Sequence, residues 1–142
     1  MRFAKHIVAT LLLALAAGTG ALANPTAPAA PGAPPIRKLD GHLVDLKGRG
    51  LYFWDGDVKG DSSQCNSQCR LLWPPLFADD NAVPKGPFNL VKRDDGRYQW
   101  ALNGRPLYRW TSDKKWGDAG GDGVADMWHL VKVAPPKAKD AR

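Results

Sequence analysis

Short stretches of alternating apolar and polar residues run along the middle of the chain, which is the pattern of strands that bury one face. The first two stretches, His42–Leu46 and Leu51–Trp54, flank Lys47-Gly48. Glycine lets the backbone reverse over a few residues. This first pair of stretches therefore predicts a β-hairpin.

A second group of stretches predicts a three-stranded meander. Tyr98–Leu102 and Pro106–Trp110 flank Asn103-Gly104, a dipeptide that tolerates the positive φ angles of a two-residue turn. Phe88–Lys92 supplies a strand ahead of them. Because proline cannot donate a ladder hydrogen bond, the strand of Pro106 is expected to begin there or to lie at an edge.

The two predicted units are copies of one another. The stretch LYFWDGD at 51–57 matches LYRWTSD at 107–113, so that Tyr, Trp and Asp recur at the same spacing. The residues just upstream of the two stretches match as well. Matched flanks indicate a duplication, with repeat one at about 38–77 and repeat two at about 88–133.

The alternation gives the aromatic residues of the motif a direction, because residues i and i+2 of a strand share a face. Tyr52 and Trp54 therefore point the same way. Tyr108 and Trp110 also share a face, and Arg109 lies on the opposite one. Since Arg109 must reach water, the Tyr/Trp face is expected to be buried, each ring contributing roughly 2–3 kcal/mol. An aromatic platform for a sugar or another flat ligand is the alternative.

The aspartates that end the motif, Asp57 and Asp113, follow the strands, where glycine begins to appear. A carboxylate at such a place accepts backbone N–H groups and closes a turn. We expect both to be loop clamps. The alternative, the paired acids of a hydrolase, has no other support in the sequence.

A short helix is predicted in SSQCNSQCRLLWPPL at 62–76. Ser62 or Ser63 is expected to cap it and Pro74-Pro75 to end it, with Leu72 and Trp73 packing inward. Trp128 takes the place of Trp73 in the second repeat.

The two cysteines of the chain, Cys65 and Cys69, lie in this segment. In an exported protein, neighbouring cysteines most often form a disulfide. The alternative is a copper or zinc site, in which the two thiolates act with His129 or His42.

The N-terminus predicts export. Arg2 and Lys5 precede the apolar run 7–17, and Ala21-Leu22-Ala23 fits the small-x-small cleavage rule, so that residues 1–23 are expected to be a signal peptide cleaved after Ala23. The apolar run is too short to span a bilayer. The protein is therefore expected in the periplasm or outside the cell.

The rest of the chain divides simply. Residues 24–36 are rich in proline and alanine and are expected to form an extended linker, and 135–142 a disordered tail. Between them, 37–134 is expected to be one small, mainly β domain of two related hairpin or meander repeats with a single short helix around the cysteines.

The two stretches LYFWDGDVKGDSSQCNSQCRLLWPPL and NGRPLYRWTSDKKWGDAGGDGVADMWHLV resemble the two copies of a bacterial secreted repeat. That family consists of predicted lipoproteins with a Tyr-x-(Phe/Trp/Tyr)-x-x-Asp motif and has no assigned function. The resemblance covers Lys38 to about Val133. Because no cysteine stands at the cleavage site, this chain departs from the lipoprotein pattern, which favours a soluble form.

Charge and composition bear on the partner. The formal net charge is +6 and falls to +4 without Arg2 and Lys5. A basic exported protein is attracted to anionic partners, whereas export removes it from nucleic acid. We expect a monomeric, non-catalytic envelope protein without a cofactor, which binds another envelope protein or an anionic polymer. A periplasmic copper- or zinc-handling protein is the alternative.

Overall fold

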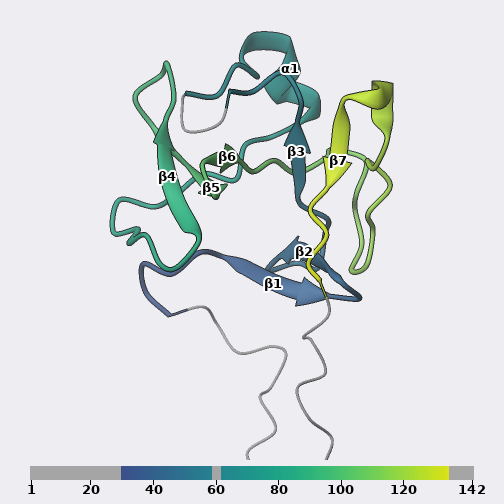
Figure 1. Cartoon of the computed structure of the whole chain (residues 1–142), viewed down its shortest axis with the longest axis horizontal. Coiled ribbons are helices and arrows are strands. Elements are labelled where there is room, and N and C mark those ends of the chain that lie inside the picture. The colour runs from purple at the N-terminus through teal and green to yellow at the C-terminus, as the bar shows by residue number, and fades with distance from the viewer. Residues whose placement is uncertain (1–29, 59–61, 135–142) are drawn as a thin grey trace, which may run out of the picture.

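The computed structural model describes residues 30–58 and 62–134 (Figure 1). The predicted signal peptide, most of the predicted linker and the predicted tail lie outside these residues. The elements are β1 (Ile36–Leu39), β2 (His42–Asp45), β3 (Tyr52–Trp54), α1 (Ser67–Leu72), β4 (Phe88–Lys92), β5 (Tyr98–Leu102), β6 (Arg105–Pro106), the 3₁₀-helix η1 (Val124–Asp126) and β7 (Trp128–Leu130). This is the small, mainly β domain with one short α-helix that the sequence predicts.

The predicted meander is present as an antiparallel sheet in the order β4-β5-β6, but its third strand, predicted over 106–110, is confined to Arg105–Pro106. Beyond it, Tyr108 makes only isolated bridges, to Tyr52 and Pro75. Asn103 and Gly104 both have positive φ angles, of 50° and 79°, as the two-residue turn requires. Strand β6 lies at the edge of the sheet. It contains Pro106, which has no N–H to offer a further strand.

The first hairpin is only partly as predicted. The chain does reverse at Gly48, where Asp45 N–H donates to Arg49 O and, farther from the turn, Leu51 N–H donates to Leu43 O. Beyond Leu51, however, the ladder partner of β3 is β7 in the other repeat, and β2 pairs with β1 instead. Figure 1 shows β3 and β7 side by side. Pairing with β7 lets Trp54 stack on Trp128, which a local hairpin would not provide.

Strand β1 itself is a second correction. The sequence predicts that its first residue, Ile36, belongs to the linker, but Ile36 pairs with Asp45 of β2. The side chain of Ile36 also packs against the hydrophobic core. The apolar residue at the end of the proline-rich stretch is therefore part of the domain.

The two repeats are joined by backbone hydrogen bonds that close into rings of three. In the first triad, Leu43 N–H donates to Val131 O (2.9 Å), Val131 N–H to Leu51 O (2.9 Å) and Leu51 N–H to Leu43 O (3.0 Å). Leu43 and Leu51 belong to repeat one, whereas Val131 belongs to repeat two. The closing segment of repeat two therefore completes the sheet of repeat one.

A second triad has the same order of bonds, with the roles of the two repeats exchanged. Trp100 N–H donates to Leu76 O (2.8 Å), Leu76 N–H to Leu107 O (2.9 Å) and Leu107 N–H to Trp100 O (2.9 Å). Here Leu76 of repeat one completes the sheet of repeat two. The six residues of the two triads are all buried and together form one hydrophobic cluster.

A second buried cluster contains Tyr52, Cys65, Trp73, Tyr108 and Trp128. At its centre, Tyr52 N–H donates to Tyr108 O (2.9 Å) and Tyr108 N–H donates to Tyr52 O (3.0 Å). This reciprocal bridge lies where the two repeats meet. The repeats are thus arranged around an approximate twofold axis that passes between the two tyrosines.

Helix α1 begins one turn later than predicted. Its N-cap is Asn66, which makes no side-chain capping bond. Ser63, one of the two expected caps, does not cap the helix, because its hydroxyl bonds to Tyr108 and Arg93 in the core. The helix ends at Leu72, ahead of Pro74 as predicted, and Trp73 is buried. Leu72 is 61% exposed, so the expectation that it packs inward is wrong. Within 30–58 and 62–134, no helix has the length and hydropathy needed to cross a bilayer.

Because each triad needs both repeats, the two halves are expected to unfold together. Native-state hydrogen exchange followed by NMR should find the six triad amides among the slowest, with the same free energy of opening in both halves. Amides of the exposed turn at 94–96 serve as the fast-exchanging reference. If one triad opens at a clearly lower free energy than the other, the repeats are not interlocked.

Candidate functional site

The Tyr and Asp of the repeated motif form hydrogen bonds across the two repeats. Tyr52 Oη donates to Asp113 Oδ2 (2.6 Å), and Tyr108 Oη donates to Asp57 Oδ2 (2.6 Å). Both tyrosine side chains are fully buried. Each copy of the motif thus supplies the aspartate that accepts the hydrogen bond from the tyrosine of the other copy.

The second oxygen of each carboxylate holds a backbone N–H. Gln64 N–H donates to Asp57 Oδ1 (2.7 Å), and Gly120 N–H donates to Asp113 Oδ1 (3.0 Å). In both repeats the donor follows the aspartate by seven residues. The structure thus places both aspartates in the geometry expected of loop clamps. The bonds to the tyrosines of the opposite repeat were not expected.

Burial controls the protonation of these groups. It raises the pKa of Tyr52 and of Tyr108 above the ordinary value of 10, and the neighbouring Asp113 and Asp57 raise the two values further. Burial also raises the pKa of Asp57, although its bonds from Tyr108 and Gln64 work against this. The two phenols are therefore fixed as neutral donors.

The tryptophans form a single stack in which the repeats alternate. Trp54 lies on Trp128 (centroids 5.6 Å apart), Trp128 on Trp73 (3.8 Å), and Trp73 on Trp110 (5.5 Å), with interplanar angles of 14°, 3° and 16°. Tyr52 meets the Trp73 ring edge-on. Trp73 and Trp128 are buried, whereas the two end rings are only partly so. The stack is therefore mostly internal packing.

Gly121 is a part of this arrangement that sequence reasoning missed. A Cβ there would lie 2.8 Å from Trp73 Cη2 and 2.9 Å from Tyr52 Cε1, closer than real side chains come. Its N–H donates to Tyr52 Oη (3.1 Å). The glycine-rich stretch after residue 116 is visible in the sequence, but its contact with the aromatic core is not.

A buried arginine of repeat two, Arg93, adds a further feature. Arg93 is 3% exposed and donates through Nη1 to Ser63 Oγ (2.7 Å) and to Gln99 Oε1 (2.6 Å), and through Nη2 to Cys65 O (2.8 Å). Ser63 in turn bonds to the Tyr108 hydroxyl. Arg93 therefore ties the cysteine segment to the motif, although nothing in its local sequence distinguishes it from a surface arginine.

The residues of the predicted metal site do not come together as such. Cys65 and Cys69 form a disulfide with a Cα–Cα separation of 5.2 Å, so the two sulfurs are not free thiolates. His129 Nε2 lies 2.7 Å from Asp55 Oδ2 on the exposed surface, and His42 lies on β2. In the described part of the chain, no three His, Cys, Asp or Glu side chains gather as a metal site.

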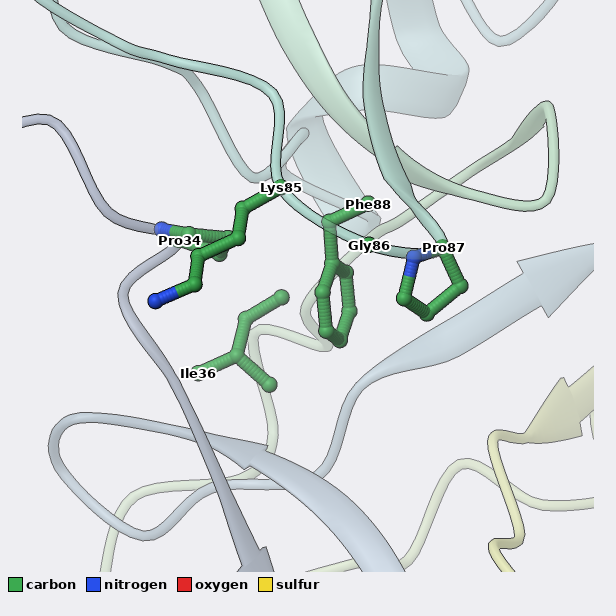
Figure 2. Close-up of a pocket in the computed structure, with 6 residues that line it drawn as sticks. All are labelled: Pro34, Ile36, Lys85, Gly86, Pro87 and Phe88. Atoms are coloured by element: carbon green, nitrogen blue, oxygen red, sulfur yellow. The ribbon is translucent and has the colours of Figure 1, made fainter.

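The described surface contains hollows of different character. Figure 2 shows an apolar one, in which the Phe88 ring faces Ile36 and the Lys85 side chain reaches past Pro34. Another, here called the Arg109 pocket, has a volume of about 270 Å³. It is lined by Pro35, Asp45, Leu46, Lys47, Arg49, Leu76, Phe77, Asp79 and Arg109.

The interlocked, duplicated architecture defines a two-repeat β domain. A family described as a secreted repeat of unknown function matches residues 36–81 and again 89–132. The chain belongs to this family, which confirms the resemblance and the duplication seen in the sequence. No curated protein and no solved structure matches the chain. The family is secreted by description, whereas cleavage after Ala23 remains a prediction.

The raised phenol pKa values predict loss of stability in alkali. A folded-state pKa above 10 gives a contribution that is fully present below pH 10 and is lost as the pH rises toward the folded value. Each tyrosine should lower the free energy of unfolding by about 1.4 kcal/mol per pH unit in that range. Urea titrations above pH 10 should show this slope, and Tyr52→Phe should remove about half of it. A slope unchanged in Tyr52→Phe would mean that the Tyr52 phenol does not control it.

Proposed function

We propose that this chain is an exported, non-catalytic binding module of the cell envelope, monomeric, whose partner is an anionic polymer. Export is supported by the family description and by the pattern of the first 23 residues. A soluble periplasmic or secreted form is the one we favour, because the segment at the expected cleavage site has no cysteine for a lipid anchor.

One observation carries the proposal: the tyrosines and aspartates of the motif that defines the repeats bond to each other between the two copies. Both Tyr–Asp pairs are bonded across the interface; Asp113 is only 2% exposed, and Asp57 is partly buried. Acids that react with a substrate must reach it, and these are held between a phenol and a backbone N–H. The motif thus supports a scaffold role, and recognition is left to the outer surface.

The charge of the chain supports an anionic partner. The formal net charge is +6, or +4 without Arg2 and Lys5. Lys114 and Lys115 are exposed and take part in no ion pair among the described residues. A net positive surface raises the local concentration of polyanions and speeds their association.

The metal-handling alternative has no comparable support. It needs two thiolates, and the sulfurs of Cys65 and Cys69 are bonded to each other. Thiolates, not disulfides, are the ligands of copper and zinc.

Retention on a sulfated polysaccharide should test the proposal. The signal-free chain should be retained on immobilised dextran sulfate and should elute as salt is raised, because screening weakens attraction between exposed charges. Unmodified dextran has the same backbone without the charge and is the matched control. Equal retention on both matrices, or retention that salt does not reduce, would contradict an electrostatic partner.

A further inference from the structure

The Arg109 pocket contains more positive charge than its carboxylates can neutralise. Lys47, Arg49 and Arg109 face two acids, Asp45 and Asp79. The pocket therefore has a net charge of one positive unit.

Asp45 is already fully occupied. Its Oδ1 accepts the N–H groups of Lys47 (2.9 Å) and Arg49 (3.1 Å), and its Oδ2 accepts Arg49 Nε (3.0 Å) and Nη2 (2.6 Å). Asp45 as a whole is 5% exposed. Asp45 and Arg49 thus neutralise each other, and Asp45 has no oxygen to spare for Arg109.

Arg109 lacks partners for its guanidinium. Nε is buried and makes no hydrogen bond, and Nη2 reaches only Pro75 O at a long 3.4 Å. Among the described residues Arg109 forms no ion pair. Burial, and then the nearby Arg49, lower the pKa of Arg109. An unsatisfied, partly buried guanidinium has the geometry to receive an anion in two parallel hydrogen bonds.

The other repeat shows that the fold does not require a charge at this position. In the aligned motifs, Phe53 takes the place of Arg109, and Arg105 takes the place of Arg49. There, the Arg105 guanidinium lies 4.1 Å from the centroid of the Phe53 ring. At the equivalent place around Arg49 of repeat one, the aromatic ring is replaced by Arg109 of repeat two, which is a second cation. Binding of an anion gives a reason for this exchange.

The other residues that line the pocket indicate that its ligand also has an apolar part. Leu46 is 37% exposed, and Phe77 is partly buried, so that apolar surface adjoins the guanidinium. A single net positive charge is neutralised by a monoanion, whereas a phosphate dianion would leave excess negative charge beside Asp79. The pocket is thus matched to a carboxylate on a small apolar body.

We propose that the Arg109 pocket is a binding site for organic carboxylates, in which Arg109 holds the carboxylate and Leu46 and Phe77 contact the apolar part. The site rests on the proposed function in that it is where a carboxylate group of the anionic partner attaches. Lys47 lies at the same pocket and adds a positive charge. Its flexible ammonium group does not require a fixed orientation of the carboxylate.

Phenylacetate is a suitable probe, titrated into the signal-free chain and followed through the Arg109 Nε–H signal and by calorimetry. Phenylacetamide, which has the same shape without the charge, should bind roughly tenfold more weakly or worse. Inorganic phosphate should also bind more weakly than phenylacetate. Equal binding of the amide, tighter binding of phosphate, or no binding of phenylacetate would overturn the assignment.

Two variants and one control locate the site. Arg109→Phe imitates the residue of the first repeat, so it should fold normally by circular dichroism and lose roughly tenfold or more in affinity. Asp79→Asn removes the opposing carboxylate and should tighten binding. Arg70→Gln removes one exposed positive charge elsewhere and should change little. Unchanged affinity in a folded Arg109→Phe protein would overturn the proposal.

Dextran-sulfate retention of the same proteins separates this site from the proposed function. If the chain is retained but Arg109→Phe still binds phenylacetate normally, the site is wrong and the function stands. If phenylacetate binding depends on Arg109 but the chain is not retained on dextran sulfate, the site stands and the polymer is the wrong partner.

Discussion

The crossed hydrogen bonds between the two copies of the motif are the constraint on which the rest of the structure depends. Two-stranded sheets are marginal in water when isolated, and two of the three sheets formed by the described residues have only two strands. They are held together because Tyr52 and Tyr108 each reach an aspartate of the opposite repeat. The tryptophan stack then fills the space between them with rings taken alternately from each half.

Duplication gives such a fold two positions for every residue, and the positions need not keep the same chemistry. The inward side is nearly symmetric, since the tyrosines, the aspartates and the central tryptophans recur with the same contacts. The outward side is not symmetric, as Phe53 and Arg109 show. An interlocked core thus leaves the surface free to acquire different binding properties in each half.

Features that depend on nearby residues could be predicted from the sequence. The turn at Asn103-Gly104, the meander around it and the disulfide follow from local geometry or from compartment. The partner of β3 could not be predicted, because two nearly identical copies offer equivalent partners and strand alternation does not distinguish them. Arg93 was missed for a related reason: its burial depends on Ser63 and Gln99, which are brought to it only by the fold.

A double-mutant cycle tests the crossing most directly. Urea unfolding of Tyr52→Phe, Asp113→Asn and the double variant should give a coupling energy of about 1–3 kcal/mol, whereas Tyr52→Phe with Asp57→Asn should be additive to within about 0.5 kcal/mol. Tyr98→Phe, which alters an exposed phenol, paired with Asp113→Asn is the control. A larger coupling between Tyr52 and Asp57, within one copy, would contradict the interlocked arrangement.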